Sequence, residues 1–177
     1  MCSMTWLYDA HIHLSDAEYE HDIPLILNCM ERLCIKACCV SMDYTSSKKT
    51  LELGKQSDFI LPFIGVHPEK AQDGVESTFK LIDENNETIS GIGEIGLDTT
   101  YTNSDEEFQK QEEVFKTQLS YAEKFGKPVS IHSRKTLDQI LEILPSYKVP
   151  SVLLHWFDGS KKQLQKSMDL DLSLIHI

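Results

Sequence analysis

The chain has 177 residues, of which 41% are hydrophobic and 25% are charged, a composition typical of one soluble globular domain that buries a substantial core. Its formal net charge of −11 excludes indiscriminate binding to duplex nucleic acid, because a net negative field does not attract a polyanion over long range. A nucleic-acid or phosphate-ester substrate is not excluded, since a bound divalent cation inverts the local field inside a pocket.

Further features of the composition favour an ordinary intracellular protein. The N-terminal residues show no basic segment followed by an apolar one, and no apolar run approaches the roughly 18 residues that span a bilayer. We therefore expect a cytoplasmic protein without a membrane partner. The spacing of the cysteines fits neither a zinc knuckle nor a disulfide framework and predicts reduced core thiols. The carboxylates concentrated between Glu76 and Glu113 are typical of a solvated face.

Short apolar strands alternate with amphipathic helices along the chain. In chain order we expect a strand at residues 6–8 leading into Asp9, a helix at 23–33, a strand at 37–40, a helix at 47–56 capped by Ser46 or Ser47, a strand at 59–66 interrupted by Pro62, and a helix at 76–84. A strand at 88–92, a helix from about 104 to 125 ended by Gly126, a strand at 128–131, a helix at 136–144 stopped by Pro145, a strand at 151–154, a helix at 160–168 and the start of a strand at 170–175 follow.

This alternation predicts an α/β fold with a parallel sheet and helices outside it. Six strand–helix units and the start of a seventh favour a TIM-type (β/α)8 barrel over an open sheet. Such a barrel takes about 250 residues. We therefore expect residues 1–177 to form a single domain with an incomplete barrel, as a fragment, an alternative product or a shortened chain.

Two histidines close the first expected strand. Residues at positions i and i+2 of a strand point to the same face, about 7 Å apart. His11 and His13 therefore project together towards the carboxyl end of the barrel, where two imidazoles can share one metal ion.

Further polar residues follow later strands. Glu94, His132 and His155 come after the fourth, fifth and sixth expected strands, and the carboxyl ends of barrel strands open on one face, which carries the active site. Burying such side chains without partners is costly, and a divalent metal ion supplies the partner. His67 lies on the same rim, where it contacts substrate, supports a ligand or serves only as a structural loop residue.

Five segments that contain these residues occur in order: Asp9-Ala10-His11-Ile12-His13, Gly65-Val66-His67-Pro68, Gly91-Ile92-Gly93-Glu94-Ile95-Gly96-Leu97-Asp98, Pro128-Val129-Ser130-Ile131-His132-Ser133-Arg134 and Leu154-His155-Trp156-Phe157-Asp158-Gly159. Together they resemble the TatD family of metal-dependent hydrolases, within the amidohydrolase-like barrels. The segment from Gln111 to Leu119 also resembles the long helix of that family, and the resemblance extends from residue 5 to about residue 170.

The resemblance implies roles for these residues. His11 and His13 bind the first of two divalent metal ions (Mg²⁺, Mn²⁺ or Zn²⁺), Glu94 bridges the two ions, and His132 and His155 bind the second. The family implies a deoxyribonuclease, often exonucleolytic, in which metal-activated water cleaves the phosphodiester bonds of DNA. Glu94, His67 and Arg134 are then the expected catalytic residues. The planar guanidinium of Arg134 suits a phosphate, and a surface salt bridge is its alternative role.

The sequence departs from the family pattern in two places. The family carries a further metal-binding aspartate in a Glu-Thr-Asp-type motif after the seventh strand, and this sequence ends before that motif. Aromatic residues usually follow the motif that ends in Asp98, where this chain has Thr99-Thr100-Tyr101.

Two alternative functions stay open at this point. One is an amidohydrolase or lactonase acting on a small carbonyl substrate, although such enzymes often use a carboxylated lysine where this chain has Glu94. The other is a non-catalytic fragment that binds metal or a partner.

Overall fold

The computed structural model describes residues 5–175 and contains seven parallel strands that pair in chain order. The strands are β1 (Leu7–Ile12), β2 (Ile35–Val40), β3 (Ile60–Ile64), β4 (Gly91–Asp98), β5 (Val129–Arg134), β6 (Val152–His155) and β7 (Ser173–Leu174). The helices are α1 (Ile23–Leu33), α2 (Tyr44–Gln56), α3 (Glu76–Glu84), α4 (Asp105–Phe125), α5 (Leu137–Ile143) and α6 (Lys161–Asp169), with short 3-10 helices at Ala17–Tyr19, Pro68–Lys70, Thr99–Tyr101 and Leu144–Ser146.

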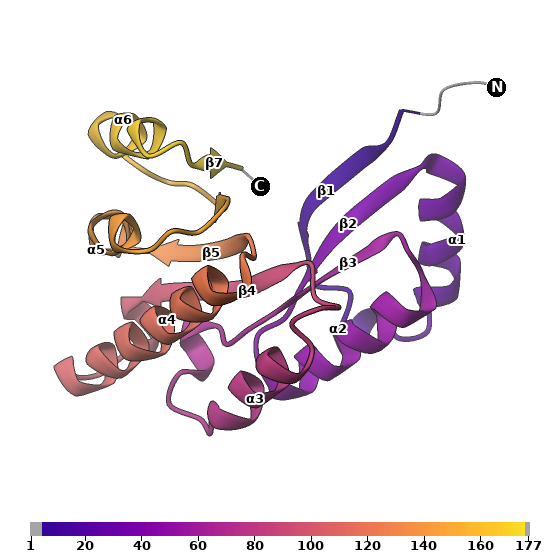
Figure 1. Cartoon of the computed structure of the whole chain (residues 1–177), viewed down its shortest axis with the longest axis horizontal. Coiled ribbons are helices and arrows are strands. Elements are labelled where there is room, and N and C mark those ends of the chain that lie inside the picture. The colour runs from indigo at the N-terminus through magenta and orange to yellow at the C-terminus, as the bar shows by residue number, and fades with distance from the viewer. Residues whose placement is uncertain (1–4, 176–177) are drawn as a thin grey trace.

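The sheet is curled, and the helices lie on its outer side (Figure 1). Each strand from β1 to β6 is followed by a helix that returns the chain to the start of the next strand, because parallel strands need a crossover connection. In the described part of the chain β1 pairs only with β2 and β7 only with β6, so the sheet stays open between these two strands. The predicted incomplete TIM-type barrel is confirmed.

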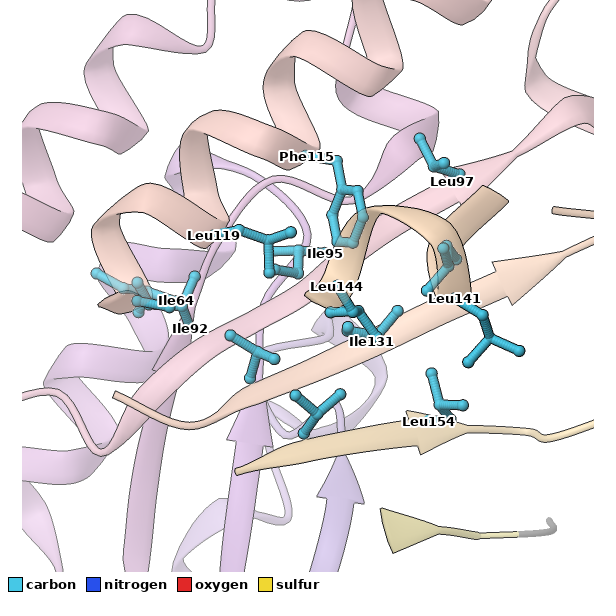
Figure 2. Close-up of a cluster of buried hydrophobic side chains, with 14 of the residues drawn as sticks. Ile64, Ile92, Ile95, Leu97, Phe115, Leu119, Ile131, Leu141, Leu144 and Leu154 are labelled. Atoms are coloured by element: carbon cyan, nitrogen blue, oxygen red, sulfur yellow. The ribbon is translucent and has the colours of Figure 1, made fainter. Parts of the chain in front are cut away.

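The main core lies between the sheet and the helices α4 and α5. Phe115 and Leu119 of α4 are fully buried and pack with the sheet residues Ile95 and Ile131 in one cluster (Figure 2). α4 begins after Ser104, whose side chain accepts a hydrogen bond from the Glu107 N–H. It ends at Gly126, where φ is +61°, as the sequence predicted. None of the helices in residues 5–175 combines the length and the apolar character needed to cross a bilayer.

The prediction for the fourth strand is wrong. The strand begins at Gly91 rather than at residue 88 and continues to Asp98, and all eight of its residues are buried. Its glycines weaken a strand pattern in the sequence but meet a packing need in the structure, because a Cβ at Gly91 would overlap the Phe63 ring. β5 likewise extends to Arg134, so Glu94 and His132 lie within strands rather than after them.

Other local predictions also need correction. α2 begins at Tyr44, and its cap is Asp43, whose carboxylate accepts from the Ser46 N–H at 2.8 Å, rather than Ser46 or Ser47. The side chain of Ser46 instead bonds back to the Asp43 N–H and completes a capping box. Among the described cysteines all are free, but Cys29 is exposed and is therefore no core thiol.

The acidic stretch from Glu76 to Glu113 is only partly the solvated face that the sequence suggested. Its surface carboxylates include Glu84 and Glu113, which pair with Lys80 and Lys110 on the same helices. Glu94 and Asp98 are buried on β4. A buried carboxylate needs charged or hydrogen-bonding partners, and those partners define the site described next.

Candidate metal centre

Histidines from several strands converge on the carboxylate of Glu94 at the carboxyl end of the sheet. On one side, its Oε2 atom lies 3.4 Å from His11 Nε2 and 3.1 Å from His13 Nε2. The two Nε2 atoms are 3.2 Å apart. His11 lies on β1 and His13 directly after its end, and the spacing of two residues brings both imidazoles to one oxygen.

The other carboxylate oxygen of Glu94 faces a different set of rings. Its Oε1 atom lies 3.0 Å from His132 Nδ1, 3.7 Å from His67 Nε2 and 3.8 Å from His155 Nε2. The two oxygens of one carboxylate thus point to two groups of nitrogens, which is the arrangement of a carboxylate that bridges two cations.

The backbone around Glu94 aims its side chain at this position. The register between β4 and β5 shifts between Ile92 and Ile95, so the residues in between leave the regular ladder. The Glu94 N–H instead donates to the Ser41 carbonyl at 2.7 Å, and the Ser41 N–H donates to the Gly93 carbonyl at 3.1 Å. Irregularities of this kind re-aim side chains next to active sites.

The ionisation of Glu94 and the neutral state of two of the histidines suit a bound cation. Burial raises the pKa of Glu94, but hydrogen bonds with His11, His13 and His132 outweigh burial and hold that pKa well below its usual range. Burial lowers the pKa of His67 to about 4 and that of His155 to about 4. Burial also lowers the pKa of His13 and of His132, but their hydrogen bonds with the Glu94 carboxylate outweigh burial and raise both pKas. A metal ion binds the neutral form of an imidazole, so binding at these two rings releases any proton that they carry.

Unpartnered ring nitrogens at the site support the fit to a metal. His13 Nδ1 and His155 Nδ1 are buried and have no hydrogen-bond partner among residues 5–175, although a buried polar atom without a partner is costly. Two groups of residues each bring their candidate ligand atoms within 4.8 Å of one another. The first group is His11, Glu94 and His155, and the second is His67, Glu94 and His132. Imidazole nitrogens with a carboxylate oxygen form a donor set for a divalent cation such as Zn²⁺ or Mn²⁺.

Two buried residues to which the sequence analysis gave no role orient the histidines. Ser130 Oγ lies 3.0 Å from His11 Nδ1, and Asp98 Oδ2 lies 2.8 Å from His132 Nε2. Groups of this kind fix the ring orientation and tautomer of metal-binding histidines. Ser130 lies two residues before His132 on the same strand, so the alternation of side chains gave a signal for it.

A buried glutamine of α4 connects the loops of the site, a role that the sequence analysis did not predict. The side-chain amide of Gln111 accepts from the Asp98 N–H at 3.0 Å and donates to the Asp98 carbonyl at 3.0 Å and the Pro68 carbonyl at 3.2 Å. It ties the end of β4 to the loop that carries His67. Its sequence signal is a polar residue on the buried face of an amphipathic helix, four residues before Phe115.

The structure places the remaining candidates at the rim. His67 is buried, and its Nδ1 accepts from the Glu69 N–H at 3.1 Å at the start of a 3-10 helix. Arg134, the last residue of β5, is exposed. Within residues 5–175 it has no carboxylate partner, so the surface salt bridge considered from the sequence is not found.

The ring of His155 lies closer to that of His11 than to that of His132. The His11 and His155 rings stack with centroids 3.7 Å apart, whereas those of His132 and His155 are 6.5 Å apart. The division of histidines between two ions therefore does not follow from the ring positions alone.

Comparison with known proteins identifies the family of the chain. The family model for TatD related DNase matches residues 8–174. The chain belongs to this family. Within the TatD family it is 29% identical to the uncharacterized metal-dependent hydrolase YabD of Bacillus subtilis, over 95% of this chain and 67% of that protein. It is 23% identical to the 3'-5' ssDNA/RNA exonuclease TatD of Pantoea ananatis, over 95% of this chain and 66% of that protein.

A solved structure in the family supports the fold. The TatD homologue YJJV of Escherichia coli superimposes with a TM-score of 0.83 at 22% identity, over 95% of this chain and 66% of that chain. The resemblance stated from the sequence is thus confirmed. The chain spans 67% of the length of YabD and 57% of the length of the putative deoxyribonuclease TATDN3 of Mus musculus.

Proposed function

We propose that the chain is a divalent-metal-dependent hydrolase that cleaves phosphodiester bonds of single-stranded nucleic acid. The observation that carries this proposal is the buried carboxylate of Glu94, whose two oxygens face two groups of histidine nitrogens. The name of the Pantoea relative, an exonuclease for single-stranded DNA and RNA, supports the substrate class.

We assign His11 and His13 to a first divalent ion, His132 and His155 to a second, and Glu94 to both. When bound, such ions lower the pKa of a coordinated water and neutralise charge on a phosphodiester. The protein contributes the rest: Glu94 stays ionised and fixes the distance between the two groups of imidazoles. Ser130 and Asp98 hold the rings of His11 and His132 in the required orientation.

His67 and Arg134 complete the proposed site. The buried imidazole of His67 borders the Glu94 carboxylate and is assigned to the substrate side of the centre. Arg134 carries an exposed guanidinium two residues beyond His132, and its planar array of donors matches a phosphate. A carboxylate between the histidines, in place of the lysine often found in amidohydrolases, favours a phosphodiester over a small carbonyl substrate.

Hydrolysis of single-stranded DNA and of a chromogenic phosphodiester tests the proposal. Purified protein is assayed with Mn²⁺, Mg²⁺, Zn²⁺ or chelator, beside the Glu94→Ala variant. We expect metal-dependent cleavage that chelator abolishes and that Glu94→Ala reduces by more than about 100-fold, since loss of an orienting partner alone costs about 10–100-fold. Equal cleavage by the parent and Glu94→Ala would contradict the role of Glu94 and, with it, the proposed site. Stoichiometric metal binding without turnover would favour a non-catalytic metal-binding role.

Replacing Asp98 should weaken metal binding without removing a ligand. In the parent protein Asp98 Oδ2 lies 2.8 Å from His132 Nε2. Asp98→Asn replaces this charged partner with a neutral amide. We expect the dissociation constant for Mn²⁺ to rise by about 10–100-fold, measured by isothermal titration calorimetry. The matched control is Asp58→Asn, the same change at an exposed surface position, which should leave the constant unchanged. Equal affinities in both variants would show that Asp98 does not orient His132.

A further inference from the structure

We propose that Trp156 forms a nucleobase-binding subsite beside the metal centre, where a base of single-stranded nucleic acid stacks on its exposed indole ring. The proposal rests on the function assigned above to the neighbouring histidines, and it adds a ligand contact that the metal centre itself does not supply.

Trp156 stands at the edge of the sheet that carries the metal centre. It follows His155, the last residue of β6, and its ring meets the His155 imidazole edge-on, with centroids 6.1 Å apart and planes at 81°. His155 is the register partner of His132 on the adjacent strand β5. A substrate phosphate at the histidines therefore has this indole next to it.

Neither packing nor backbone preference explains a tryptophan at this position. The residue is 60% exposed, so most of its apolar surface is not removed from water. Its φ of +51° lies in the left-handed region that bulky residues rarely adopt and that glycine adopts without cost. A strained backbone that presents a large exposed ring beside a polar site is typical of a functional position.

The chain on both sides holds the indole in place. His155 on one side is buried, and on the other side Phe157 is 4% exposed and belongs to the main core. The Phe157 N–H also donates to the Ile175 carbonyl at 3.0 Å. The exposed ring therefore projects from a fixed backbone, and a ligand that stacks on it loses little free energy to ordering the protein.

The residues around Trp156 favour a nucleobase as the ligand. Aromatic side chains beside a cationic group form the usual platform for single strands, because every base has a π-face. Arg134 supplies an exposed cation on the neighbouring strand. Tyr101 supplies a second exposed ring, edge-on to His67 at 5.9 Å. Stacking needs no net positive charge, so it is compatible with a chain of net charge −11.

The two tryptophans of the chain make the test specific. The other one, Trp6, stacks on Phe59 at 5.5 Å, and a Trp6→Phe background leaves Trp156 as the only indole. With chelator present to prevent hydrolysis, oligothymidylate is titrated against this variant and compared with an abasic deoxyribose-phosphate strand of equal length. We expect oligothymidylate to quench the fluorescence and the abasic strand to leave it unchanged.

Substitutions at Trp156 then measure the contribution of stacking. We expect Trp156→Ala to raise the dissociation constant for oligothymidylate by about 5- to 150-fold, Trp156→Phe to recover most of the affinity, and the abasic strand to bind all variants equally. Trp156→Gly should weaken oligothymidylate binding equally while its Tm equals or exceeds that of the parent, because glycine relieves the positive φ. This result would separate lost stacking from lost folding.

The outcomes distinguish this inference from the proposed function. Unchanged affinity in Trp156→Ala, or equal losses for both strands, would overturn the subsite even if Glu94-dependent cleavage is present. Quenching and selective loss for oligothymidylate would support the subsite even if the protein cleaves neither DNA nor the chromogenic phosphodiester, in which case the proposed hydrolysis alone fails.

Discussion

Chelator-treated protein should gain about 5–11 °C in Tm when Mn²⁺ is added at about 100 times its dissociation constant. A ligand at that concentration stabilises the folded state by about 2.7 kcal/mol, and a chain of this size gains about 2–4 °C per kcal/mol. We expect Glu94→Gln to abolish most of this gain, because the amide cannot offer two anionic oxygens to the groups at His13 and His132. Differential scanning fluorimetry with and without the metal measures the shift.

The comparison is made against each variant's own Tm without metal, so a change in intrinsic stability does not affect it. Glu87→Gln makes the same chemical change at an exposed position and should keep the full gain. If the metal-induced gain in Tm persists in Glu94→Gln, the metal binds elsewhere. The buried histidine nitrogens would then not be explained by metal binding.

Gly96→Ala should be among the most damaging single substitutions in the chain. Gly96 has φ +145°, and a Cβ there would overlap the carbonyl group of His132 on the neighbouring strand. Backbone strain of about 1–3 kcal/mol and overpacking of about 1–3 kcal/mol together predict a loss of about 2–6 kcal/mol. Because the contact is with backbone, no side-chain rotation relieves it. Urea unfolding followed by circular dichroism measures the loss.

Gly126→Ala provides the matched control. Gly126 also has positive φ, +61°, but a Cβ there would meet nothing within 4 Å. Only the left-handed conformation is then penalised, at about 1–2 kcal/mol. Equal losses in the two variants would mean that φ alone, and not the approach of β5, explains the glycine at position 96.

The sequence by itself determined the alternation of strands and helices and which residues meet in the candidate metal centre. The limits of α1 and α3, and the end of α4 at Gly126, follow from helical periodicity and local capping signals. The sequence could predict that His11 and His13 lie side by side, because residues two positions apart on a strand point to the same face. His132 and His155 could be placed beside them because the carboxyl ends of parallel strands meet at one edge.

Only the tertiary structure decided the length of β4 and the position of Glu94 between two groups of imidazoles. Glycine lowers the strand propensity of any local window, and the need for glycine at Gly91 arises from a ring on another strand. The contact of Ser130 with His11 joins residues 119 positions apart. Local propensity carries no information about such a pair, which depends on how far the sheet curls.

The environment of Trp156 was likewise decided by the fold. In the sequence it is one apolar residue after a strand, and apolar residues are on average buried. The turn after β6 buries Phe157 instead and leaves the indole exposed beside His155. Local periodicity thus fixes the elements and the residues at their ends, whereas side-chain exposure and contacts across strands follow from the packing of the whole sheet.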